Sequence, residues 1–213
     1  MICKSIVMFL SIPCIATLAQ TNRLVRAKTR GSMVLRDRVA NQLQSYGLGQ
    51  WFDTMLRESR AIIGGSFVLR AVTCDQWESG DVDMYVSESE GRCGIELIDR
   101  YMSSHGGRVI QTAHGQGKSG YVTTHWLYQL DRIRVDLTMV MGKPTNLAKY
   151  LVDTYDYDFC MNWYSASELV VARIDSIISR RSVDHHATRA WIPLVTRVLR
   201  MDKYRQRGYR VVW

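Results

Sequence analysis

Alternating polar and apolar positions mark strands in the middle of the chain. Residues 81–86 read Asp-Val-Asp-Met-Tyr-Val, and residues 132–140 alternate in the same way around Asp136. Side chains two positions apart in a strand point to the same face of the sheet. The pattern therefore predicts two half-buried strands that each carry carboxylates on one face. Residues 121–130 predict a further strand, which forms a hairpin with residues 132–140.

Helical periodicity surrounds these strands. Apolar residues recur at intervals of three and four across residues 34–60, with a glycine-containing break at residues 47–49. A short apolar run at residues 61–63 precedes helical spacing over residues 67–72. An amphipathic helix is predicted over residues 191–198, and Gly208 is a helix C-cap candidate after a basic last turn. Together these elements predict an α/β fold, with a mixed twisted sheet and flanking helices.

The first 30 residues form a pattern of their own. Ile6, Phe9 and Leu10 lie at helical spacing, and Pro13 interrupts the run before a second apolar stretch. These features predict a small N-terminal helical segment. Two other interpretations stay open, which are a plain helical cap and a secretory signal over residues 1–19. The run is shorter than the about 20 apolar residues of a membrane span, so no membrane partner is expected.

Composition narrows the class of protein. The chain has 213 residues, of which 46% are hydrophobic and 23% are charged, as in ordinary globular proteins. These values argue against a disordered, collagen-like or coiled-coil chain. The five cysteines are an odd number and include no CxxC pair, which argues against a disulfide framework and a zinc ribbon. A reducing compartment, the cytoplasm or the nucleus, is therefore expected.

The net charge of +8 is unevenly distributed. Residues 1–60 carry +6, residues 61–172 carry −5 and residues 173–213 carry +7. An acidic middle between basic ends favours a carboxylate-bearing site flanked by a surface that attracts phosphate groups. Two solvated, arginine-rich helical faces would give the same counts, so charge alone does not decide between the two interpretations.

The candidate chemistry lies in a glycine turn and three carboxylates. Gly64-Gly65-Ser66 falls between the short apolar strand and a helix, where backbone N–H groups and a serine hydroxyl bind phosphate. Asp81 and Asp83 share one face of their strand, and Asp136 lies in a matching position on a later strand. If these strands are neighbours, the three carboxylates converge and supply the oxygen ligands that Mg²⁺ prefers.

The order of these motifs resembles the nucleotidyltransferase superfamily that includes DNA polymerase beta. The resemblance covers about residues 60–180 and includes the Gly-Ser turn, the Asp-x-Asp strand and the later lone Asp. The segments Tyr-Asp-Tyr-Asp-Phe-Cys-Met-Asn at residues 155–162 and Lys-Tyr-x-x-Arg-Gly at residues 203–208 are similar to uncharacterised fungal members. Some of those members begin with an F-box-like segment, which residues 1–30 resemble. Residues 67–80 form a slightly longer connection than the superfamily usually has.

The resemblance implies a nucleotidyltransferase fold and specific roles. Gly64, Gly65 and Ser66 would bind a nucleoside triphosphate (NTP), and Asp81, Asp83 and Asp136 would be catalytic and hold Mg²⁺ or Mn²⁺. The implied reaction moves a nucleoside monophosphate to the hydroxyl of an acceptor, which could be RNA, a protein or a small molecule. The basic ends favour an anionic acceptor.

The alternative function is a non-catalytic adaptor or binding module. In that case residues 1–30 would bind a ubiquitin-ligase scaffold, and the transferase-like domain would recognise a nucleotide or a protein. The expected organisation is an F-box-like segment at residues 1–30, a nucleotidyltransferase-like domain at residues 31–180 and a basic helical extension at residues 181–213.

Several other polar positions are interpreted as structural. Residues 114–120 lack the first glycine of a P-loop and are expected to form a flexible loop. Asp158 is expected to begin a turn or short helix, with a further site carboxylate as the alternative interpretation. Cys160 is expected to lie in the core. Asp184 is expected to cap the next helix. The His185-His186 pair has no partner ligands at metal spacing and is expected at the surface.

Overall fold

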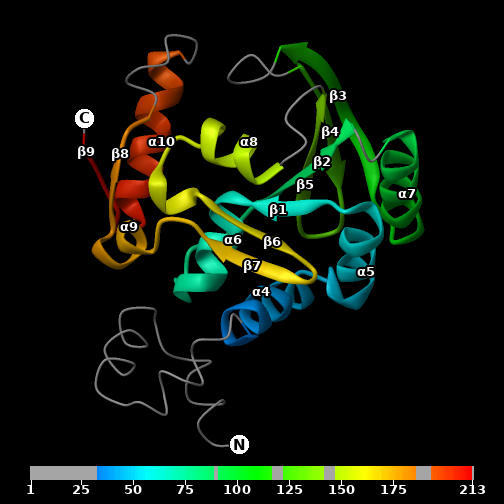
Figure 1. Cartoon of the computed structure of the whole chain (residues 1–213), viewed down its shortest axis with the longest axis horizontal. Coiled ribbons are helices and arrows are strands. Elements are labelled where there is room, and N and C mark those ends of the chain that lie inside the picture. The colour runs from blue at the N-terminus through cyan, green and yellow to red at the C-terminus, as the bar shows by residue number, and fades with distance from the viewer. Residues whose placement is uncertain (1–32, 89–90, 117–121, 142–146, 186–192, 213) are drawn as a thin grey trace, which may run out of the picture.

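The computed structural model shows a sheet covered on both faces by helices (Figure 1). It describes residues 33–88, 91–116, 122–141, 147–185 and 193–212. The predicted N-terminal segment at residues 1–30, with its F-box-like, helical-cap and signal interpretations, lies outside these residues. None of the described helices is long and apolar enough to cross a membrane.

Seven strands of the described chain form the main sheet, in the order β3-β4-β5-β2-β1-β6-β7. Their bounds are β1 Ile62–Gly64, β2 Asp81–Ser87, β3 Arg108–Gln116, β4 Val122–Gln129, β5 Arg134–Met141, β6 Asn162–Ser165 and β7 Glu168–Val171. The central strands β2 and β5 are parallel, whereas the other neighbours are antiparallel. The expectation of a mixed sheet in an α/β fold is confirmed, as are the strand at residues 81–86 and the hairpin.

The helices of the main body are α4 Met33–Ser45, α5 Gly49–Ser59, α6 Gly65–Thr73, α7 Gly91–Ser104 and α8 Leu147–Thr154. The predicted break near residue 47 separates α4 from α5, and the predicted helix at residues 67–72 is α6. The main core lies between α4 to α7 and one face of the sheet, where Phe52, Phe67 and Ile98 pack with Val82 and Leu137. On the other face, α8 buries Tyr150 and Leu151 against the sheet.

The remaining elements are η3 Asp158–Cys160, α9 Ile174–Ser179, β8 Arg181–Val183, α10 Leu194–Gln206 and β9 Arg210–Val212. Strands β8 and β9 form a small parallel pair. Met201, Tyr204 and Tyr209 of this C-terminal part belong to the main core. The aromatic rings of Phe159 and Tyr209 lie 4.4 Å apart. Residues 194–212 therefore pack as a part of the domain.

One sequence prediction about the C-terminal helix is confirmed, and one about element bounds needs correction. The helix is described from Leu194 to Gln206, with Met201 and Tyr204 buried in the core, and the predicted C-cap Gly208 follows with a φ of +81°. Residues 114–120 were expected to be loop, but the first three belong to β3 and pair with Thr124, Thr123 and Val122 of β4. Residues 117–121 lie outside the described chain.

Candidate active site

The parallel pairing of β2 with β5 brings the predicted carboxylates to one face of the sheet. Asp83 and Asp136 are direct register partners, and Asp81 lies opposite Arg134. Because side chains two positions apart share a face, all three carboxylates lie on the face that α8 partly covers. The sequence-based expectation that the two strands are neighbours is confirmed.

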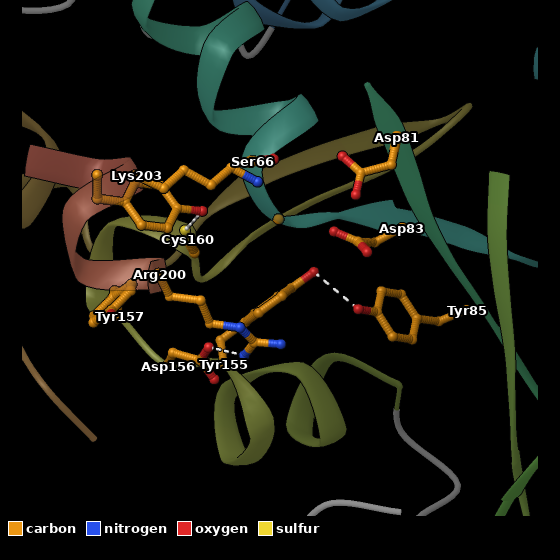
Figure 2. A pocket seen from close by; sticks show the side chains of 12 residues that line it. Ser66, Asp81, Asp83, Tyr85, Tyr155, Asp156, Tyr157, Cys160, Arg200 and Lys203 are labelled. Atoms are coloured by element: carbon orange, nitrogen blue, oxygen red, sulfur yellow. Dashed lines mark hydrogen bonds and ion pairs between the residues drawn. The ribbon is translucent and has the colours of Figure 1, made fainter. Parts of the chain in front are cut away.

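A cavity of about 170 Å³ opens on this face (Figure 2). Four parts of the chain contribute to it: strand β2, the beginning of α6, the segment around η3, and α10. The lining residues are Gly65, Ser66, Asp81, Asp83, Tyr85, Tyr155, Asp156, Tyr157, Cys160, Arg200, Lys203 and Tyr204. The cavity therefore gathers residues that are far apart in the sequence.

Asp136 lies on the same face but does not line this cavity. Its Oδ1 atom is 3.8 Å from Nδ1 of His125 on β4, and 46% of its side chain is exposed. The His125 ring also hydrogen-bonds the Thr138 hydroxyl at 2.9 Å. Asp136 is nevertheless the direct neighbour of Asp83 on the adjacent strand. After burial and the charge of Asp83, its charge contributes to raising the pKa of Tyr85, which lines the cavity.

The glycine turn is shaped by the close approach of other side chains. Gly65 has a φ of +70°, and a Cβ atom there would lie 2.6 Å from Oδ2 of Asp83. A Cβ on Gly64 would overlap the hydroxyl of Tyr155. Glycine is therefore required at Gly65 by backbone conformation and at Gly64 by space.

The turn opens helix α6 beside the carboxylates. Gly64 is the N-cap residue and has no side chain that could accept the first helical N–H groups. Ser66 follows in the first turn and is buried, with 6% of its surface exposed. A helix N-terminus of this kind is a favourable place for a phosphate oxygen, because N–H groups and the helix dipole face it.

Helix α10 supplies two cations to the opposite wall, and sequence reasoning did not assign them to the site. Arg200 donates a hydrogen bond from its guanidinium to Oδ2 of Asp156. Lys203 is exposed, and within the described chain it has no carboxylate at ion-pair distance. Figure 2 shows both side chains extending from α10 into the cavity. The only sequence signal was the Lys-Tyr-x-x-Arg-Gly segment, to which no role was given.

Tyrosines fill the space between the carboxylates and the cations. The Tyr155 hydroxyl donates a hydrogen bond to the Tyr85 hydroxyl at 3.4 Å. Burial raises the pKa of both phenols, and the charge of Asp83 raises them further. Both hydroxyls are therefore protonated at neutral pH and serve as donors or acceptors rather than as bases.

Cys160 is a buried lining residue without nucleophilic character. Its thiol donates a hydrogen bond to the Tyr204 hydroxyl, at a distance of 3.0 Å. Burial raises the pKa of Cys160 to about 12, so the reactive thiolate is absent at neutral pH. The prediction that this residue belongs to the core is confirmed, because 4% of it is exposed.

Two carboxylates at the cavity, those of Asp81 and Asp83, are ligands of the kind that a hard divalent cation binds. Among the described residues, no group of three His, Cys, Asp or Glu side chains could hold a metal ion. Asp81 and Asp83 nevertheless present oxygen ligands from one rigid strand to the same cavity. Mg²⁺ usually takes one or two protein carboxylates and completes its shell with water and substrate phosphates. The pair is therefore chemically suited to Mg²⁺.

The remaining polar candidates have structural partners. Asp158 begins η3, as predicted. Its Oδ1 atom lies 2.9 Å from Nε2 of His185, which is hydrogen-bond distance. His185 is thus a half-buried partner of Asp158.

Asp184 is predicted to cap the next helix, but residues 186–192, where that cap would form, lie outside the described chain. Asp184 itself is buried, forms an isolated bridge with Tyr157 and pairs with Arg197 of α10 at 3.0 Å. A buried carboxylate requires such a cation, and this partner could not be seen from local sequence.

Comparison with known proteins assigns no family. No protein-family model matches the chain, and no curated protein matches it either.

Proposed function

We propose that this chain is a metal-dependent nucleotidyltransferase with the corresponding fold. It would transfer a nucleoside monophosphate from an NTP to an acceptor hydroxyl and release pyrophosphate. The observation that supports the proposal is the composition of one cavity. The Gly-Ser turn, the Asp-x-Asp strand, the segment at residues 155–160 and the Lys203-Tyr204 pair, which are distant in sequence, all line it.

The cavity is suited to the phosphates of the NTP rather than to the whole molecule. Its volume of about 170 Å³ is below the range of roughly 300–1,000 Å³ of pockets that enclose a whole small ligand. The N-terminus of α6 and the Ser66 hydroxyl would donate hydrogen bonds to phosphate oxygens from one side. Lys203 and Arg200 would offset phosphate charge from the other side. The nucleoside would then lie at the opening.

The carboxylates would act at the α-phosphate, where bonds form and break. Asp81 and Asp83 would hold Mg²⁺ or Mn²⁺ beside the phosphates, with Asp136 on the adjacent strand. When bound, the metal would neutralise charge on the phosphates and lower the pKa of the attacking hydroxyl. The carboxylate of Asp136 would accept the hydroxyl proton while the acceptor oxygen bonds to the α-phosphorus and the bond to pyrophosphate breaks.

The open position of Asp136 bears on the acceptor. This carboxylate is half-exposed, and the neighbouring side chains of Arg132 and Arg134 are exposed. An acceptor hydroxyl would therefore approach from solvent across the surface of β4 and β5. The positive charge of these arginines suits an anionic acceptor such as RNA, an acidic protein segment or a phosphorylated small molecule.

The test is transfer of label from each of four α-³²P-labelled NTPs. The reactions contain Mg²⁺ or Mn²⁺ and offer total RNA or cell lysate as acceptor. Asp83→Asn keeps the shape of the side chain and removes its charge, and we expect transfer to fall by about 100-fold or more. Asp131→Asn is the matched control, because Asp131 lies in the β4–β5 turn with 95% of its side chain exposed.

The outcomes separate the proposal from its alternative. Label transfer that Asp83→Asn abolishes and Asp131→Asn preserves supports the transferase. NTP binding without transfer to any acceptor contradicts catalysis and favours the non-catalytic binding module. Absence of both binding and transfer in a folded protein, as judged by circular dichroism, overturns the nucleotide assignment altogether.

A further inference from the structure

Strand β3 forms one edge of the main sheet, and within the described chain no strand lies beyond it (Figure 1). It is the longest strand of that sheet, with nine residues from Arg108 to Gln116. Its neighbour in the described sheet is β4, on one side. The side chains from Arg108 to His114 are all exposed. The backbone N–H and C=O groups along the outer edge of β3 are therefore open to a further strand.

The opposite edge of the sheet is protected against such pairing. There β7 has only four residues and begins with the charged, exposed side chain of Glu168. Arg36 of α4 donates a hydrogen bond to the Ser167 carbonyl beside that strand, at 3.5 Å. Short edge strands, charged side chains and covering elements are the usual means by which proteins prevent edge pairing. Strand β7 has all three of these features.

Strand β3 lacks most of this protection. Residues 109–116 contain no Lys, Arg, Asp, Glu or Pro. A register shift between Val109 and Gln111 marks a bulge near the beginning of the strand, but the pairing with β4 continues without interruption from Gln111 to Gln116. A long, uncharged edge segment without proline is a template for another strand.

Two apolar side chains on β3 would gain from such a strand. Val109 is 44% exposed and Ile110 is 49% exposed. Among the described residues before Ile174, they are the only large apolar side chains that are exposed. Neighbours on a paired strand would remove part of their surface from water. The edge therefore offers both backbone hydrogen bonds and apolar contact to an extended partner.

The charge pattern of the strand suits a second copy of itself. Arg108, at its beginning, is the only Lys, Arg, Asp or Glu of β3. In an antiparallel pair with a two-fold axis near Thr112, the two Arg108 side chains lie at opposite ends of the ladder. A rise of about 3.4 Å per residue separates them by roughly 25–30 Å, well beyond the Debye length of about 8 Å at physiological ionic strength. A parallel pair would place them side by side, where like charges repel.

We propose that two copies of this chain pair edge to edge through β3, in antiparallel orientation about a two-fold axis. The pairing satisfies the outer backbone groups of both strands and joins the two main sheets into one continuous sheet. The proposal does not depend on the nucleotidyltransferase assignment, because no residue of β3 lines the candidate active site. Strands β4 and β5 separate β3 from β2, so both cavities stay open in the dimer.

The test is sedimentation velocity of the full chain over roughly 1 µM to 1 mM, a range that covers weak and moderate affinities. We expect a dimer whose population rises with concentration. Ala113→Lys and Thr112→Lys each add a charge at an exposed position of the edge, on opposite faces of the sheet. Each should raise the dimer Kd about tenfold or more, because the two-fold axis brings the two new charges close together. Asn41→Lys is the matched control, since it adds the same charge at an exposed position of α4.

Hydrogen exchange of the backbone amides separates edge pairing from other contacts. Protection of the amides of residues 108–116 should rise with the concentration of the wild type and of Asn41→Lys, but not with that of either edge variant. A monomer throughout the range, or a dimer that both edge variants preserve, overturns the proposal. A dimer that only one edge variant weakens also overturns it, because that result indicates packing on one face of the sheet. Protection that is independent of concentration in a monomer assigns the edge to another segment of the chain and overturns the proposal as well.

Discussion

At Gly65 the backbone conformation and the geometry of the candidate site depend on the same residue. Three glycines allow the contributions to be separated by substitution with alanine. Gly49 has an ordinary φ and nothing within 4 Å of its missing Cβ. Gly47 has a φ of +78° and is equally open. Gly65 has a φ of +70° and is crowded by Asp83 and Tyr155.

The expected free energies of unfolding follow from these environments. Gly49→Ala should stabilise the protein by about 0.5–1 kcal/mol, because it lies at the start of α5 and restricts the unfolded chain. Gly47→Ala should destabilise it by about 1–2 kcal/mol, the cost of a left-handed conformation in an L-residue. Gly65→Ala should destabilise the protein by about 1 kcal/mol more than Gly47→Ala does. The additional cost arises because the new methyl group displaces Tyr155 and breaks its hydrogen bond to Tyr85.

The functional consequence of Gly65→Ala is larger than its effect on stability. The new methyl group forces the Asp83 carboxylate to rotate away, so label transfer should fall as in Asp83→Asn. Urea unfolding monitored by circular dichroism gives the stabilities, and the transfer assay gives the activities. The reasoning is refuted if Gly65→Ala keeps wild-type transfer, or if it destabilises the protein no more than Gly47→Ala does.

Two further predictions concern buried ionisable groups. Burial raises the pKa of Cys160 from 9.0 to about 12, so its contribution to stability is complete below pH 9 and is lost as the pH rises toward 12. Between these pH values the free energy of unfolding should fall less steeply with pH for Cys160→Ala than for the wild type. An equal slope in the two proteins would contradict the raised pKa of Cys160. Asp184→Ala leaves Arg197 without its buried partner and should cost about 3–5 kcal/mol. The exposed pair of Asp202 with Arg205 is the control, since Asp202→Ala should cost less than about 1 kcal/mol; comparable losses would refute the argument.

The sequence predicted those parts of the fold whose pattern is local. Strands β2 and β5 alternate because one face is buried, and the order of burial along β2 follows that alternation. Strand β3 was not predicted, since residues 108–114 are exposed on both faces and have no alternation to detect. Pairing with β4 alone keeps that segment extended.

One part of the candidate site could be predicted from local sequence in the same way. Gly65, Ser66, Asp81 and Asp83 belong to short motifs with a mechanism, and the structure brings them to one cavity. Arg200 and Lys203 could not be found from periodicity, because their helix reaches the cavity only through long-range packing of Met201 and Tyr204. The contact of Asp136 with His125 also depends on three-dimensional structure, because it requires the pairing of β4 with β5.

The distance in sequence between the two walls of the cavity has a kinetic consequence. Strand β2 and helix α10 come from opposite parts of the described chain, so their approach closes a long loop at a cost in conformational entropy. Such contacts form slowly during folding. A ligand that touches both walls links them without a covalent bond, and its binding energy adds to the stability of the folded state. Resistance of the C-terminal helix to proteolysis should therefore rise with the concentration of any molecule that occupies the cavity, even one that never reacts.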